Sequence, residues 1–150
     1  MSGSETISRD TGGAAPPKVL LVDDDPALLA LMAAAFTRAG YAIRTATNGR
    51  KALAVLEDYR CDLVVTDIVM PELEGIGAIL EIKRHRNPPK VIAISGAGPG
   101  SRRDYLKWAK VLGADEVLAK PFRMSEILAL SGRVIANTTL NSNPLLNCGS

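Results

Sequence analysis

The sequence predicts an α/β fold, a doubly wound parallel sheet in which five strands alternate with five helices in a (βα)5 order. Two observations predict this class. Short continuous runs of apolar residues recur along the chain, and most end at a polar or charged residue, as strands buried on both faces do. Longer segments with apolar residues at helical spacing lie between the runs. Right-handed crossovers between such strands place helices on both faces of the sheet.

The first unit begins at Lys18. Residues 19–22 form an apolar run that leads into three consecutive aspartates, which predicts a central strand. Asp25 followed by Pro26 is typical of an N-cap and the first residue of a helix. We expect this helix to end at Gly40. Its broad apolar face comprises Leu28, Leu29, Leu31, Met32, Ala35 and Phe36.

The second and third strands are expected over residues 41–46 and 63–65, which are rich in strand-forming residues. Asn48 and Gly49 begin the helix between them. The inward face of this helix comprises Ala52, Leu53, Val55 and Leu56. The third strand is followed almost at once by Asp67, so a charge lies where a buried strand ends.

The remaining elements keep the same order. They are a third helix entered at Gly75 and ending before Asn87, a strand over residues 91–94 that ends at Ser95, a fourth helix over residues 102–112, a strand over residues 116–119 and a last helix over about residues 125–136. The loop from Gly96 to Ser101 contains three glycines and a proline, and we expect it to be mobile.

One folded domain is expected over residues 18–136, because a chain of 150 residues supports a single core. Residues 1–17, rich in Ser, Thr, Gly, Ala and Pro, and residues 137–150, rich in Asn, predict a flexible leader and a flexible tail. A formal net charge of +2 is too small to imply a nucleic-acid partner. No apolar run reaches the ~20 residues that cross a bilayer, so no membrane partner is expected. Cys61 and Cys148 are interpreted as free thiols, which favours a cytoplasmic location.

Polar and charged side chains follow four of the five expected strands. Asp23 and Asp24 follow the first strand and Asp67 the third, while Ser95 and Lys120 follow the fourth and fifth. The carboxyl ends of parallel strands meet at one edge of a sheet, so these side chains should lie together. Three close carboxylates repel one another unless a cation neutralises them. Mg²⁺ fits best, since it takes few protein carboxylates and keeps positions for water or phosphate oxygens.

Ser95 and Lys120 distinguish simple metal binding from chemistry. A bound metal needs neither residue. A phosphoryl group on Asp67 would present three anionic oxygens, one for Mg²⁺, one for the Lys120 ammonium and one for the Ser95 hydroxyl. Asp67, Mg²⁺, Lys120 and Ser95 together are the groups that transfer of phosphate to a carboxylate requires.

Four motifs at these positions resemble those of the receiver domains of two-component response regulators. They are Leu-Val-Asp-Asp-Asp-Pro, Thr-Asp-Ile-Val-Met-Pro-Glu-Leu-Glu-Gly, Ile-Ala-Ile-Ser-Gly and Leu-Ala-Lys-Pro-Phe. The motifs occur in the order of that family, and the resemblance covers about residues 18–136. It implies a flavodoxin-like sheet with strand order 2-1-3-4-5.

The resemblance also implies a role for each site residue. Asp67 would be the phosphoacceptor. Mg²⁺ would be held by Asp24 directly, by Asp23 through water, by Asp67 and by the backbone carbonyl of Val69. The metal cofactor is therefore expected to be Mg²⁺.

On the same resemblance, Ser95 would move toward the phosphoryl group and Lys120 would be its counter-ion. The bond between Lys120 and Pro121 is expected to be cis. Relatives commonly carry Tyr or Phe three positions before this lysine, as part of the switch, whereas this chain has Val117. This departure favours a switch based on movement of the fourth helix and the loop before it.

Val69 and Ala97 lie two positions past Asp67 and Ser95, where relatives often have side chains that position a water. Neither can hydrogen-bond through its side chain, which predicts slow self-dephosphorylation. Val69 also replaces the second acid expected of an aspartyl-phosphate hydrolase, so that enzyme class has less support. We therefore expect a phosphoacceptor and not an enzyme with turnover.

The leading hypothesis is a phosphorylation-controlled signalling switch. A histidine kinase or a His-containing phosphotransfer protein would donate the phosphoryl group. The face made by the fourth helix, fifth strand and fifth helix would then contact a downstream protein. We expect a monomer or a weak dimer. Two alternatives stay open, a receiver excised from a larger hybrid kinase or regulator and a pseudo-receiver that binds partners without phosphorylation.

Overall fold

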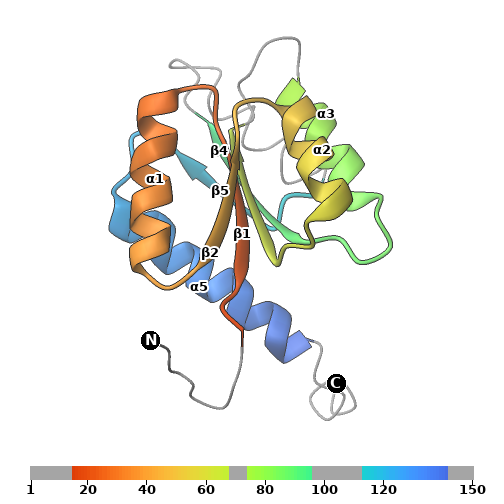
Figure 1. Cartoon of the computed structure of the whole chain (residues 1–150). Helices are drawn as coiled ribbons and strands as arrows, with labels where there is room; N and C mark the ends of the chain where they lie inside the picture. Colours follow the sequence, from red (N-terminus) through yellow and green to blue (C-terminus); the bar gives the residue numbers. More distant parts are fainter. Residues whose placement is uncertain (1–14, 68–73, 96–112, 142–150) are drawn as a thin grey trace, which may run out of the picture.

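A computed structural model describes residues 15–67, 74–95 and 113–141, and these form one parallel sheet covered by helices on both faces (Figure 1). The strand order is β2-β1-β3-β4-β5, which confirms the predicted flavodoxin-like sheet. Helices α1 and α5 cover one face, and α2 and α3 cover the other. The bounds are β1 Lys18–Val22, α1 Pro26–Arg38, β2 Ala42–Ala46, α2 Gly49–Asp58, β3 Leu63–Asp67, α3 Glu74–Lys83, β4 Lys90–Ser95, β5 Glu116–Ala119 and α5 Met124–Asn141.

The register of the strands brings their carboxyl ends to one level. Val22 pairs with Thr66, so the residue after β1 lies beside the last residue of β3. Ser95, the last residue of β4, pairs with Ala119 at the end of β5. The side chains that follow these strands therefore project from the same edge of the sheet.

The sheet separates two hydrophobic clusters. Alternate strand residues point to opposite faces, so Leu20 and Val64 pack beneath α2 and α3 while Leu21 and Val65 pack beneath α1 and α5. All of these side chains are fully buried. The continuous apolar runs of the sequence are thus explained, because each central strand is covered on both faces.

Helix α1 begins at the predicted cap. The side chain of Asp25 accepts hydrogen bonds from the backbone N–H groups of Ala27 and Leu28, and Pro26 follows as the first helical residue. Gly40 adopts a positive φ of 103° just past the helix end, as predicted for that residue. Leu31 was predicted to belong to the broad apolar face of this helix, but its side chain is 61% exposed. The buried face of α1 is narrower and comprises Leu29, Met32 and Phe36.

Helix α2 begins where predicted, at Asn48 and Gly49, and the structure makes Asn48 its N-cap. Asn48 accepts a hydrogen bond from the backbone N–H of Lys51 at 2.7 Å. Ala52 is buried and Leu53, Val55 and Leu56 pack against the same cluster, which confirms the predicted inward face. In α3, Ile79 and Ile82 are fully buried, whereas Leu80 is 43% exposed.

Helix α5 extends further than predicted. It ends at Asn141 and not near Ala136, so its last turn occupies part of the expected tail. No Gly or Pro follows Ala136 until Pro144, and nothing in that stretch stops a helix. The predicted fourth helix and the loop before it, which was expected to be mobile, lie outside the described residues. Within the ranges that the structure describes, none of the helices is long and apolar enough to cross a membrane.

A polar network closes the amino ends of the last two strands. The Asp115 carboxylate lies 2.9 Å from Lys83 Nζ and 3.7 Å from Lys90 Nζ, and it accepts a hydrogen bond from the Val91 N–H at 2.8 Å. Gly113, with a φ of 119°, lets the chain pass Lys83 closely just before this point. The amino edge is therefore held by ion pairs in which two lysines share one aspartate.

Candidate functional site

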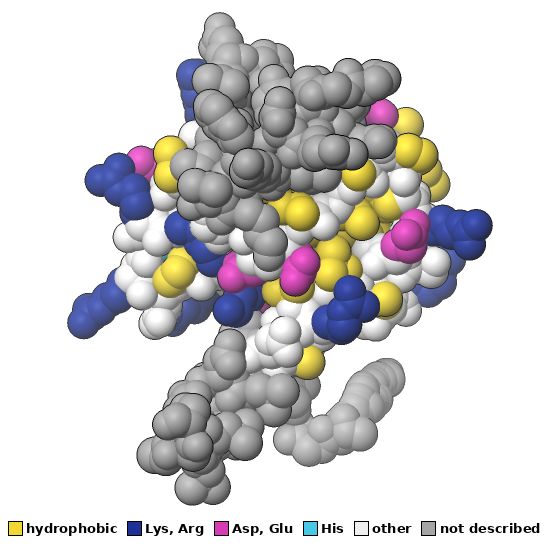
Figure 2. All heavy atoms as spheres, turned by 180° about the vertical axis from the view of Figure 1, so that it is seen from behind, with side chains coloured by type: hydrophobic (Ala, Val, Ile, Leu, Met, Phe, Trp, Pro, Cys, Tyr) yellow, Lys and Arg dark blue, Asp and Glu magenta, His cyan; other side chains and the backbone are white. Residues whose placement is uncertain are grey.

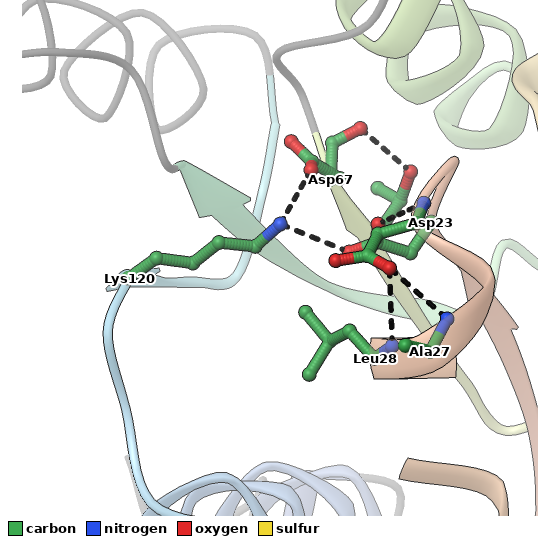
Figure 3. Close-up of polar contacts among 7 residues, drawn as sticks. Asp23, Ala27, Leu28, Asp67 and Lys120 are labelled. Atoms are coloured by element: carbon green, nitrogen blue, oxygen red, sulfur yellow. Dashed lines mark hydrogen bonds and ion pairs between the residues drawn. The ribbon is translucent and has the colours of Figure 1, made fainter. Parts of the chain in front are cut away.

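Three carboxylates gather at the carboxyl edge of the sheet. Asp23 and Asp24 follow β1, and Asp67 ends β3; Figure 3 shows Asp23 and Asp67 beside each other. Each offers a carboxylate oxygen, and these oxygens all lie within 4.8 Å of one another. Asp23 and Asp67 are buried, while Asp24 is exposed to solvent. The predicted grouping of these acids is thus what the fold produces.

Lys120 supplies positive charge to this group from the edge strand. Its Nζ lies 2.9 Å from Asp67 Oδ2 and 3.2 Å from Asp23 Oδ2. Figure 3 shows its side chain reaching both acids. Burial alone would lower the pKa of Lys120, but the hydrogen bond to Asp67 and the charges of both acids raise it overall. The bond between Lys120 and Pro121 is cis, as predicted. Lys120 is thus the shared counter-ion of two buried acids.

The two oxygens of Asp23 differ in their surroundings. Oδ1 accepts a hydrogen bond from the backbone N–H of Asp25 at 2.8 Å. Oδ2 is buried and accepts no hydrogen bond of good geometry, although the ammonium of Lys120 lies near it. Burial raises the pKa of Asp23, and the Asp25 N–H and the charge of Lys120 offset part of this effect. A buried carboxylate oxygen with spare capacity is what a hard cation such as Mg²⁺ requires, so the donor set fits that ion.

Ser95 and Val117 occupy the two neighbouring strands. Ser95 is buried at the end of β4, directly after Ile94, which pairs with Asp67. Its carbonyl accepts a hydrogen bond from the Lys120 N–H at 2.9 Å, so the two predicted site residues are joined through the backbone. Val117 is half-buried and packs against the cluster beneath α2 and α3. Val69 and Ala97 lie outside the described residues.

Two groups that make hydrogen bonds at this edge were not predicted from the sequence. The amide of Asp25, a residue recognised only as a helix cap, binds Asp23. The hydroxyl of Thr66 is buried beside Asp67 and donates to the backbone carbonyl of Asp67 at 3.3 Å. A threonine inside an otherwise apolar strand is the signal that marks this second contact.

The described surface away from the carboxyl edge contains weaker candidates for a functional site. A hollow of about 390 Å³ lies at the opposite edge, between the ends of α2 and α3, and none of the predicted site residues lines it. On the face seen in Figure 2, the described Lys and Arg side chains are spread among acidic and hydrophobic ones. The carboxyl edge is therefore the strongest candidate for the functional site.

The chain matches the model of the response regulator receiver domain over residues 19–131. It is 36% identical over 131 residues to a transcriptional regulatory protein, the CpxR homolog of Haemophilus influenzae, and 28% identical over 141 residues to the transcriptional regulatory protein TcrA of Mycobacterium tuberculosis. The aligned regions cover 87% and 94% of this chain but only 55% and 54% of those regulators. The chain thus spans about half the length of each.

Solved structures agree with this match. The receiver domain of the Francisella response regulator 1452 superimposes with a TM-score of 0.72 at 26% identity, covering 81% of this chain and 98% of that domain. A signal receiver domain from Bermanella marisrubri gives a TM-score of 0.71 at 27% identity, with 80% and 98% covered. The strand order β2-β1-β3-β4-β5 also agrees with the receiver fold of these neighbours. The chain therefore belongs to the response regulator receiver domain family of two-component signalling.

Proposed function

We propose that this receiver domain accepts a phosphoryl group on Asp67 from a histidine kinase or a His-containing phosphotransfer protein. The observation that carries the proposal is the environment of Asp67. Its carboxylate lies at the sheet edge with Lys120 Nζ at 2.9 Å and with two further acids close by. Lys120 is positioned to pair with an added phosphoryl oxygen, because it already contacts the acceptor side chain.

The transfer would exchange one bond to phosphorus for another. An oxygen of Asp67 attacks the phosphorus of a phosphohistidine, and the bond from phosphorus to the imidazole nitrogen breaks as the new bond forms. The imidazole leaves with the electron pair and takes up a proton. Lys120 offsets the charge that remains on the phosphoryl oxygens, and the Ser95 hydroxyl is the proposed hydrogen-bond donor to a third oxygen.

Mg²⁺ is the proposed cofactor of this transfer. Asp23, Asp24, Asp67 and the carbonyl of Val69 would hold the ion, and Oδ2 of Asp23, which is buried and accepts no hydrogen bond of good geometry, supports this assignment. When bound, Mg²⁺ supplies positive charge to the phosphoryl oxygens and to the acids. The ion pairs of Lys120 alone leave the three acids with an excess of negative charge.

Output is proposed to occur through protein contacts on the face that includes β5 and α5. Val117 and Leu118 of β5 are only half-buried. This edge strand therefore has side-chain surface that a partner protein could contact, which supports the proposal. The two transcriptional regulatory proteins named above are nearly twice as long as the matched region. This length favours the alternative that the sequence is the receiver part of a larger regulator, and the absence of a nucleic-acid partner stays a prediction.

The test is phosphorylation by acetyl phosphate with Mg²⁺, followed by intact mass. Asp67→Asn removes the acceptor. Asp62→Asn is the matched control, because Asp62 lies just before β3, at the other end of the same strand, and binds the Lys18 N–H. We expect one added phosphoryl group in the unsubstituted chain and in the control, and none in Asp67→Asn. Consumption of acetyl phosphate without accumulation would indicate a hydrolase instead, and no modification would indicate a pseudo-receiver.

The lifetime of the product tests the prediction for Val69 and Ala97. Because neither side chain can position water, the phosphorylated chain should persist for minutes or longer in Mg²⁺ after the donor is removed. Loss of the added mass within seconds would contradict this prediction.

A further inference from the structure

The turn between β1 and α1 is organised by Asp25. Its backbone N–H donates to Asp23 Oδ1 at 2.8 Å. Its side-chain Oδ1 accepts from the N–H groups of Ala27 at 3.0 Å and Leu28 at 3.3 Å, and its carbonyl accepts from the Leu29 N–H at 3.0 Å. One residue therefore connects the first turn of α1 to a buried acid of the site.

We propose that Asp25 is a positioning residue of the cation site. Its side-chain cap holds its backbone in the extended conformation, with φ of −92° and ψ of 106°. That conformation aims the Asp25 N–H at Oδ1 of Asp23, and the remaining oxygen, Oδ2, is left directed toward Asp67 and Lys120. This inference rests on the Mg²⁺ site of the proposed function.

The geometry separates this role from that of a ligand. Asp25 is exposed, and its Oδ1 is already occupied by two backbone N–H groups. Its carboxylate is not among the three that come within 4.8 Å of one another. Groups that orient a metal ligand without touching the metal commonly change metal affinity by 10–100-fold when removed. Asp25 acts through Asp23 in this manner.

Two substitutions separate the cap from the charge. Asp25→Asn keeps an oxygen that accepts from the N–H groups of the first turn, whereas Asp25→Ala removes it. Both substitutions remove the same negative charge near the site, so long-range attraction of Mg²⁺ falls equally. A difference in Mg²⁺ affinity between the two variants therefore reports the cap alone.

A third variant controls for loss of helix stability. Asn48 caps α2 by accepting from the Lys51 N–H, and the structure gives it no hydrogen bond or ion pair with Asp23, Asp67 or Lys120. Asn48→Ala should therefore lower the free energy of unfolding of the chain while leaving its affinity for Mg²⁺ unchanged.

The experiment is calorimetric titration of the whole chain and the three variants with MgCl2, together with urea unfolding. We expect Asp25→Ala to bind Mg²⁺ about fivefold more weakly than Asp25→Asn, since loss of a cap lets the turn leave the competent conformation. Equal affinities in these two variants would overturn the inference, and so would an equal weakening in Asn48→Ala. Absence of Mg²⁺ binding by the unsubstituted chain would overturn the proposed metal site as well.

Discussion

Replacement of Lys120 by Met removes the counter-ion of two buried acids while keeping most of the side-chain volume. Asp23 and Asp67 are fully or almost fully buried, and the Lys120 side chain is 24% exposed. Removing one partner of a buried ion pair costs about 3–5 kcal/mol, and the partial exposure of Lys120 favours the lower end of that range. We therefore expect the variant, without Mg²⁺, to lose about 3 kcal/mol of its free energy of unfolding.

The same substitution should strengthen Mg²⁺ binding. In the unsubstituted chain the ammonium of Lys120 lies against the acids that would hold the ion. A unit charge and a divalent cation about 5 Å apart repel by about 1.7 kcal/mol even at the dielectric constant of water, so Lys120→Met should tighten binding by at least about tenfold. Mg²⁺ should also restore much of the lost stability, because a ligand that binds only the folded state stabilises it.

The assay is calorimetric titration with MgCl2, with urea unfolding measured in its presence and absence. Lys83→Met is the matched control, since Lys83 also pairs with an aspartate at 2.9 Å but lies at the opposite edge. The control should lose about 1 kcal/mol or less, because its ion pair is partly exposed, and its Mg²⁺ affinity should not change. Equal or weaker Mg²⁺ binding by Lys120→Met would refute the view that the lysine and the metal compete for the same acids.

Two further predictions concern stability alone. Burial raises the pKa of the Cys61 thiol to about 12 from an ordinary value of 9.0. The unfolded chain therefore releases this proton first, and stability falls as pH rises from 9.0 toward 12. Between pH 8 and pH 10 the loss should be about 1.4 kcal/mol greater than in Cys61→Ala, by urea unfolding, and equal losses would contradict the raised pKa. Gly113→Ala should destabilise by about 2 kcal/mol, because φ is 119° and the new Cβ would lie 3.2 Å from Lys83 Cγ. Gly132→Ala, in the exposed middle of α5 with nothing near the new Cβ, should stabilise by about 1 kcal/mol, and a reversed order of these two variants in thermal unfolding would contradict the local geometry.

Much of the fold was predictable because its signals are local. The runs at residues 19–22 and 91–94 are apolar throughout, and the structure buries each between two layers of helices. The cap Asp25 was recognised from residue type and position, and it accepts the expected backbone hydrogen bonds; the helix start at Asn48 was also predicted, and there the structure adds a capping hydrogen bond. Leu31 was assigned wrongly because helical spacing gives the width of an apolar face only approximately.

The sequence was sufficient to predict which side chains meet at the site. Parallel strands bring their carboxyl ends together, so the positions of Asp23, Asp67 and Lys120 followed from topology. The different surroundings of the two oxygens of Asp23 could not be predicted from the topology. They depend on side-chain torsions and on the backbone amide of Asp25 in the next turn. The Lys83 and Asp115 pair was also missed, since it joins α3 to the segment before β5 and no local pattern links those positions.

The charge clusters at the two edges of the sheet have net charges of opposite sign. At the amino edge, Asp115 meets two lysines, so that cluster has one positive charge in excess. At the carboxyl edge, three aspartates meet Lys120, so that cluster has two negative charges in excess. The formal net charge of +2 conceals this opposition. The excess of negative charge at the edge that holds Asp67 favours the approach of small cations there, and raised ionic strength should weaken this attraction.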